Sequence, residues 1–184
     1  MAAMSPRGRK LALTAHVTVS VGWLGAVAAF LALAVAGLAG KDAQTARSAY
    51  LAMDVTGWYV IVPLAAASLL TGMISALGTT WGLLRHYWVV VKLVITVLAT
   101  VALLVHMGPV SYVAGLAAGP DWSAGEHAGL GAQLVIQSGA AVLVLLVATA
   151  LSVYKPQGRT RYGRRRHVAG TATSGRPRGI ATMR

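Results

Sequence analysis

Four long apolar stretches, separated by shorter polar ones, organise the chain. The first two contain no charged residue over at least 28 positions, and the last two carry a single lysine between them. A helix needs about 20 apolar residues to cross the ~30 Å hydrocarbon core of a bilayer, and each stretch meets that length. The pattern predicts an all-α bundle of four transmembrane helices, over residues 11–40, 55–82, 87–107 and 127–154.

The polar segments complete this plan. Residues 1–10 form a basic leader, residues 41–54 are polar enough to leave the bilayer, and residues 155–184 have too few apolar residues to fold. We therefore expect a disordered basic tail. Because the apolar run over residues 11–40 exceeds the ~7–15 residues of a secretory signal, the first helix is predicted to stay uncleaved.

Two prolines lie in or beside the apolar stretches. Pro63 lacks the N–H that would bond to the carbonyl of Tyr59, so it is predicted to kink the second helix. The pair Gly108-Pro109 combines a residue that favours helix ends with one that cannot continue the hydrogen-bond ladder. This pair is predicted to end the third helix.

Composition supports a membrane protein. Hydrophobic residues make up 57% of the chain and charged residues only 11%, too few to cover a soluble domain of 184 residues. The absence of cysteine excludes disulfides, thiolate metal sites, iron–sulfur clusters and covalent haem attachment. The net charge of +12 comes mainly from the tail, and no nucleic-acid motif accompanies it, so anionic lipid headgroups are the expected partner of the tail.

The charges also predict an orientation. The leader, the turn before the third helix together with Lys92, and the tail contain 14 of the 16 lysines and arginines. The two opposite loops contain only Lys41 and Arg47, together with all four acids of the chain. By the positive-inside rule, both termini are predicted to be cytoplasmic.

Lys92 lies about six residues, or ~9 Å, inside the third helix if that helix begins near His86. An intramembrane charge is a candidate functional group. The alternative is that Lys92 snorkels, with its stem along the helix and its ammonium among the headgroups. Several polar residues are predicted to share its depth near the cytoplasmic face; they are His16, Thr71, Ser75 and Ser152.

At ~100° per residue, two polar stripes are predicted to face the bundle interior. One, on the third helix, contains Lys92, Thr96, Ala99, Leu103 and His106. The other, on the fourth helix, contains Glu126, Gln133 and Gln137. His86 and His106 point ~160° apart on one helix and cannot both face that interior.

Near the outer face, His106 is predicted to close the third helix and His127 to open the fourth. Consecutive antiparallel helices are usually neighbours, so the two imidazoles are predicted to lie at one depth. Met53, Met107 or Glu126 could complete a metal site there, because imidazole and thioether are suitable copper ligands. The alternative is that each histidine is an interfacial or helix-end residue without a ligand.

Short motifs around the second turn resemble a known family. They are Thr71-Gly72, Trp81-Gly82, the sequence YWVVVKL over residues 87–93, and HVTVSVGWLG over residues 16–25. Together they are similar to the CopD-type copper-resistance membrane domain and to related bacterial integral membrane families of unknown function. The resemblance covers residues 10–107 and implies a helical bundle of the bacterial cytoplasmic membrane with a copper or haem connection.

Three functions are compatible with these patterns. The first is binding of haem b or copper through His16, or through His106 and His127. The second is a non-catalytic accessory subunit that packs against a partner membrane protein through small residues of the first helix; these are Thr18, Gly22, Gly25 and Ala29. The third, a transporter or enzyme using Lys92, ranks last, because no acid–base pair, activated nucleophile or phosphate loop accompanies that lysine.

Overall fold

The computed structural model describes residues 4–40, 42–77, 87–120, 122–123 and 127–154. Within these ranges all regular structure is helical: α1 (Pro6–Ala39), α2 (Ala43–Thr56), the π-helical turn η1 (Gly57–Ile61), α3 (Val62–Leu77), α4 (Tyr87–Ala118) and α5 (Ala128–Tyr154). Because α2, η1 and α3 are continuous, these elements form four helical rods. Each rod is long and apolar enough to cross a membrane, which confirms the predicted fold of a multi-pass bundle.

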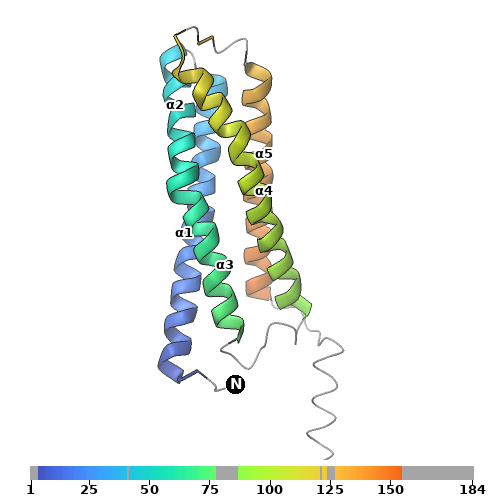
Figure 1. Cartoon of the computed structure of the whole chain (residues 1–184). Helices are drawn as coiled ribbons and strands as arrows, with labels where there is room; N and C mark the ends of the chain where they lie inside the picture. The colour runs from blue at the N-terminus through green and yellow to red at the C-terminus, as the bar shows by residue number, and fades with distance from the viewer. Residues whose placement is uncertain (1–3, 41, 78–86, 121, 124–126, 155–184) are drawn as a thin grey trace, which may run out of the picture.

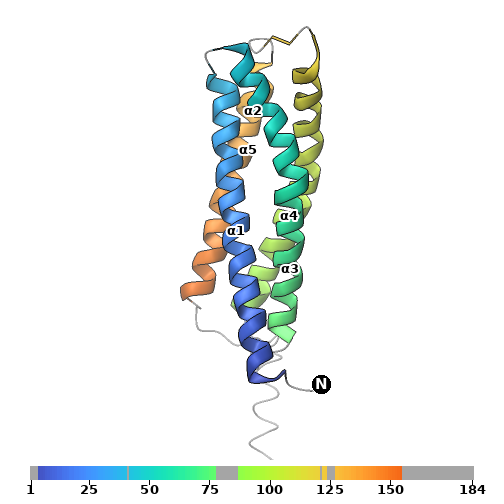
Figure 2. The same ribbon diagram turned by 90° about the vertical axis from the view of Figure 1, so that its left-hand side faces the viewer.

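The rods run up and down along one long axis (Figure 1). The start of α1, the end of α3, the start of α4 and the end of α5 lie at one end of the bundle, and α2 lies at the other (Figures 1 and 2). Helix α1 packs against α2, α3 and α5, and α4 packs mainly against α2, α3 and α5. The start of α1 and the end of α5 therefore lie on one side of the bundle, and the assignment of that side to the cytoplasm stays a prediction from charge.

The second rod begins earlier than predicted. Residues 43–54 are helical rather than a loop, and Asp42 caps the helix by accepting a 2.7 Å hydrogen bond from the backbone N–H of Thr45. This bond holds the pKa of Asp42 below its usual value. Buried residues recur every three or four positions along α2, at Ala46, Ala49, Tyr50 and Met53. The segment is polar because it is amphipathic and covers one end of the bundle.

The irregularity expected at Pro63 takes the form of the π-turn directly before it. The N–H of Val62 bonds to the carbonyl of Gly57, five residues back, instead of four. A π-turn inserts one extra residue and changes the helix direction without a break. Figure 2 shows α2 running at an angle to α3 across this turn.

The third span does not stop at Gly108-Pro109, so that predicted boundary is wrong. Helix α4 passes through Pro109 and continues to Ala118. The residues beyond the proline are apolar, and Val110, Val113 and Ala117 are buried in the core. Burial of this apolar face outweighs the one hydrogen bond that proline removes.

The end of α4 is capped by a residue of the second rod. The guanidinium of Arg47 donates to the backbone carbonyls of Ala117 and Gly119. These carbonyls have no partner within the helix, and a cation there also complements the helix dipole. Arg47, which the charge pattern placed in an outer loop, therefore joins α2 to α4.

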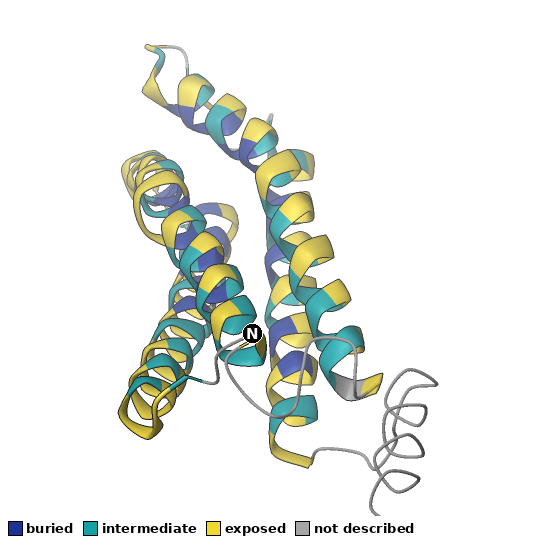
Figure 3. Cartoon of the chain, turned by 60° about the horizontal axis from the view of Figure 1, so that its bottom comes forward, coloured by how far each residue is buried: buried dark blue, intermediate teal, exposed yellow. Residues whose placement is uncertain are grey.

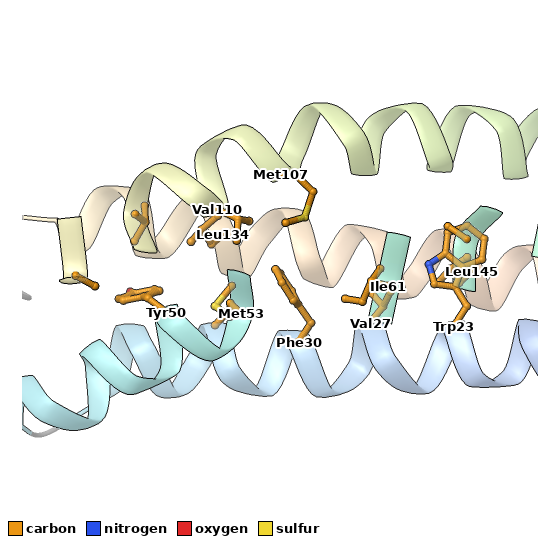
Figure 4. Close-up of a cluster of buried hydrophobic side chains, with 14 of the residues drawn as sticks. Trp23, Val27, Phe30, Tyr50, Met53, Ile61, Met107, Val110, Leu134 and Leu145 are labelled. Carbon is orange, nitrogen blue, oxygen red and sulfur yellow. The ribbon is translucent and has the colours of Figure 1, made fainter. Parts of the chain in front are cut away.

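The core is densest toward the α2 end of the bundle. Figure 4 shows Phe30, Met53, Met107 and Leu134 pointing toward one another from different helices. A Cβ added to Gly57 would lie 2.5 Å from the Met107 methyl, so only glycine permits this contact. Figure 3 shows the buried residues as stripes along the helices, with exposed residues on the outer sides.

The predicted interior stripes are right for one helix and wrong for the other. On α4, Lys92, Thr96, Ala99, Leu103 and His106 are all half-buried. On α5, Gln133 and Gln137 are exposed. The buried α5 residues are Gly131, Leu134, Ser138, Leu145 and Ala148. The interior face of α5 is thus mostly apolar and is rotated by about 100° from the glutamines. Glu126 and the basic tail over residues 155–184 lie outside the described residues.

Candidate functional site

Three helices bring His16, Thr71 and Lys92 together. The Nδ1 atom of His16 on α1 lies 3.1 Å from the Thr71 hydroxyl on α3. On its other side, the Nε2 atom of His16 lies 3.4 Å from the Lys92 ammonium on α4. These residues were predicted to share one depth, and the structure brings them into direct contact.

A series of polar contacts between α1 and α3 positions the imidazole. One turn before His16, the Ser75 hydroxyl donates to the Ala12 carbonyl at 3.3 Å. One turn after it, the hydroxyls of Ser20 and Ser68 are 2.9 Å apart. We call these contacts, with His16–Thr71 between them, the α1–α3 polar seam. Interhelical hydrogen bonds of this kind join membrane helices that lack a hydrophobic driving force.

Gly72 allows the imidazole to lie against α3. A Cβ added there would be 3.0 Å from Cε1 of His16. That separation is closer than carbon atoms normally approach, so any larger residue would move the ring or the helix. The two residues therefore have different roles, because Thr71 forms a hydrogen bond with the His16 ring and Gly72 leaves space for that ring.

The hydrogen bonds assign the tautomer of His16. The Thr71 hydroxyl has one proton and donates it to the carbonyl of Ala67, at 2.7 Å. It can then only accept from the imidazole, so Nδ1 carries the proton and Nε2 presents its lone pair to Lys92. Nε2 of His16 is therefore held in a fixed direction as a hydrogen-bond acceptor or metal ligand.

Lys92 does not snorkel to the headgroups in this structure. Its ammonium contacts the imidazole of His16 inside the bundle. The described acids are bound elsewhere, Asp42 to Thr45 and Asp54 to the Ser111 hydroxyl at 2.6 Å. Ser111 lies 19 residues, or about 28 Å, along α4 from Lys92. Neither acid neutralises the lysine.

His106 and His127 have separate surroundings, so the prediction that they share one depth is wrong. His106 packs edge-on against Phe30, with 6.2 Å between the ring centroids, and Gln137 faces it. Gln137 lies ten residues, or about 15 Å, along α5 from His127. The difference arises because α4 continues past Pro109 instead of ending near His106.

His127 instead belongs to the loop that precedes α5. Its Nδ1 atom is 3.0 Å from the Ser123 carbonyl, and its ring stacks on Trp122 with 5.2 Å between centroids. Met53 and Met107 are wholly buried in the core. The predicted set of His106, His127, Met53 and Met107 is therefore not assembled around one point. Among the residues described, no three His, Cys, Asp or Glu side chains form a metal-binding group.

One polar group, formed by Asp54, Trp58 and Ser111, was not predicted from the sequence. The Trp58 indole N–H donates to the Ser111 hydroxyl at 3.1 Å, and that hydroxyl donates to Asp54. The signal available in the sequence was the spacing of Asp54 and Trp58, four residues apart on one helical face. Ser152, predicted at the depth of Lys92, donates to the Ala148 carbonyl of its own helix, and no other partner of it lies among the described residues.

Comparison with family models, with curated proteins and with solved structures finds no match to this chain. The resemblance to the CopD-type domain accordingly stays a prediction. Among the residues that carry it, His16, Thr71-Gly72 and Lys92 are brought together at one site, whereas Trp81-Gly82 lies outside the described residues.

Proposed function

We propose that this protein binds haem, with His16 and Lys92 as nitrogen ligands on opposite faces of the iron. The observation that carries the proposal is the 3.4 Å approach of the two side-chain nitrogens, Nε2 and Nζ, from facing helices. Metal–nitrogen bonds are about 2.0–2.1 Å long, so two nitrogens on opposite sides of one ion stand ~4 Å apart. A small outward movement of α4 would give this separation.

The contacts of His16 suit a metal ligand. A ligating histidine usually donates its other ring N–H to a fixed acceptor, which sets the tautomer and the ring orientation. Thr71 provides that acceptor. Lysine ligates only as the neutral amine, so the metal would take the place of the proton that Lys92 now directs at His16.

The number of donors favours haem over Cu(II). A Cu(II) ion bound by protein alone prefers a tetragonal set of about four ligands, whereas the macrocycle of haem supplies four nitrogens and leaves one or two positions to the protein. The described residues offer no group of three His, Cys, Asp or Glu side chains. Two facing nitrogens meet the needs of haem and fall short of those of Cu(II).

The loose packing of the first part of α4 supports the proposal. From Tyr87 to His106, no described α4 side chain is buried, so this half of the helix is held loosely compared with the half beyond Met107. Displacing it would disturb few core contacts. Arg9 and Lys10 lie seven and six residues before His16, about 10 Å along α1, where they could pair with the haem propionates.

The test is haem content of the purified protein in lipid nanodiscs, measured by Soret absorption against protein concentration. We expect about one haem per chain in the wild type and loss of at least nine-tenths of it in His16→Ala. His127→Ala is the matched control and should keep the wild-type content. Wild-type haem content in His16→Ala, or copper without haem by metal analysis, would contradict the proposal.

A second function, the accessory subunit, is supported by the surface of α1. Thr18, Gly22, Gly25 and Ala29 are all exposed, and a Cβ added to Gly25 would meet no atom within 4 Å. Such a small-residue face permits close approach of another membrane helix. Gly25→Ile should reduce the mass of the complex extracted from native membranes, whereas Gly139→Ile, at an equally open glycine of α5, should not.

A further inference from the structure

His106 is a polar side chain without a polar partner inside the bundle. Both of its ring nitrogens are buried and neither forms a hydrogen bond. Its nearest aromatic neighbour is Phe30, which presents a ring edge at a 65° interplanar angle. Buried polar groups are nearly always satisfied by protein, water or ligand, so this imidazole has an unused donor and an unused acceptor.

Gln137 places a second polar group beside this ring. Its side chain faces His106 without reaching hydrogen-bond geometry with either nitrogen. Gln137 is also exposed on the surface of the bundle, nine residues or about 14 Å from the start of α5. An amide at this depth would face hydrocarbon. It therefore marks the point between α4 and α5 where a molecule dissolved in the bilayer would enter, with the Gln137 side chain moving aside because both ring nitrogens of His106 are buried.

The surroundings define the ligand by its chemistry. Phe30 and the wholly buried Met107 form an apolar wall, which suits a flat, uncharged body. The imidazole and the amide each offer one donor and one acceptor, which suits oxygens that are carbonyls in one form and hydroxyls in the other. The described residues form no group of three His, Cys, Asp or Glu side chains here, so the chemistry favours an organic ligand over a metal ion.

We infer that His106 and Gln137 form a binding site for the headgroup of a membrane-soluble quinone. The site lies 14 residues, or about 21 Å, along α4 from Lys92. It shares no residue with the proposed haem site. The inference therefore does not rest on haem binding, and each proposal can fail without the other.

The test uses the full chain in nanodiscs, with histidine labelled by ¹⁵N, and a benzoquinone carrying a decyl chain as the probe. We expect the His106 side-chain nitrogens to shift on titration while those of His127 stay in place. Gln137→Leu should weaken the apparent affinity at least tenfold. Gln133→Leu, an equally exposed amide one turn away on the same helix, is the matched control and should leave the affinity unchanged.

His106→Phe separates a binding role from a structural one. Because the replaced nitrogens bond to nothing, the unliganded variant should be at least as heat-stable as the wild type, yet it should no longer bind the probe. If this variant does not fold, the nitrogen shifts and the Gln137→Leu comparison still decide the question. Unmoved His106 nitrogens at saturating quinone, or equal effects of the two glutamine variants, would overturn the site and leave Gln137 as a simple neighbour of the ring.

Discussion

Replacing Thr71 by valine tests the geometry of the proposed haem site. Valine keeps the shape of threonine but removes the hydroxyl that accepts from Nδ1 of His16. It also removes the bond from that hydroxyl to the carbonyl of Ala67. The imidazole would then lose the contact that fixes its tautomer and its direction toward Lys92.

The expected size of the effect follows from these contacts. A hydrogen bond between membrane helices contributes about 0.6 kcal/mol on average, so the unliganded Thr71→Val variant should lose roughly 1 kcal/mol of stability. Loss of the partner of a ligating histidine lowers metal affinity about 10–100-fold, equivalent to ~1.4–2.7 kcal/mol. Haem affinity should therefore fall more than stability does.

The assay is a haem titration in nanodiscs, together with thermal unfolding of the haem-free protein. Thr100→Val is the matched control, because within the described part of the chain the Thr100 hydroxyl bonds to its own helix alone, at the Thr96 carbonyl 2.8 Å away. The control should bind haem as the wild type does. If Thr71→Val bound haem within twofold of the wild type, the hydroxyl would not orient a ligand, and this reasoning would be refuted.

Three further predictions concern packing, capping and pH. Gly72→Ala should cost about 1–3 kcal/mol by crowding the His16 ring, measured by thermal unfolding; a neutral result would mean that α3 moves freely. Arg47→Met leaves the last α4 carbonyls without their donor and should increase hydrogen exchange there, while unchanged protection would discount the cap. The bond from the Thr45 N–H lowers the pKa of Asp42 in the folded protein. The ionised carboxylate therefore adds stability above the pKa of the unfolded chain, and this stability is lost as the pH falls through the folded pKa. Asp42→Ala should abolish this dependence, so that the melting curves of wild type and variant become equal at low pH.

The fold was largely predictable, because a long uncharged run has few alternatives to a spanning helix. The errors came from amphipathic and proline-containing segments. Residues 43–54 looked like a loop since their polar residues were counted without their helical spacing, although Ala46, Ala49 and Met53 all face the core. The continuation of α4 past Pro109 could not be predicted from the neighbouring residues alone, because it depends on burial against other helices.

The sequence predicted the depth of the candidate-site residues in the membrane, but not which of their side chains touch. Charge distribution and helix length placed His16, Thr71 and Lys92 at one level, and the structure joins them. The rotation of each helix about its axis was harder to predict. On α5 the polar stripe of Gln133 and Gln137 was predicted to face the interior, whereas a mostly apolar face that includes Leu134 and Leu145 occupies it.

The central claim is that His16 and Lys92 together ligate one haem iron, and the spin state of the ferric haem tests it most directly. Magnetic circular dichroism of the haem-loaded protein should show a low-spin, six-coordinate iron in the wild type. Lys92→Leu should retain haem through His16 but change the iron to a high-spin, five-coordinate form. A low-spin spectrum that Lys92→Leu leaves unchanged would contradict the account, because the sixth ligand would then come from another residue.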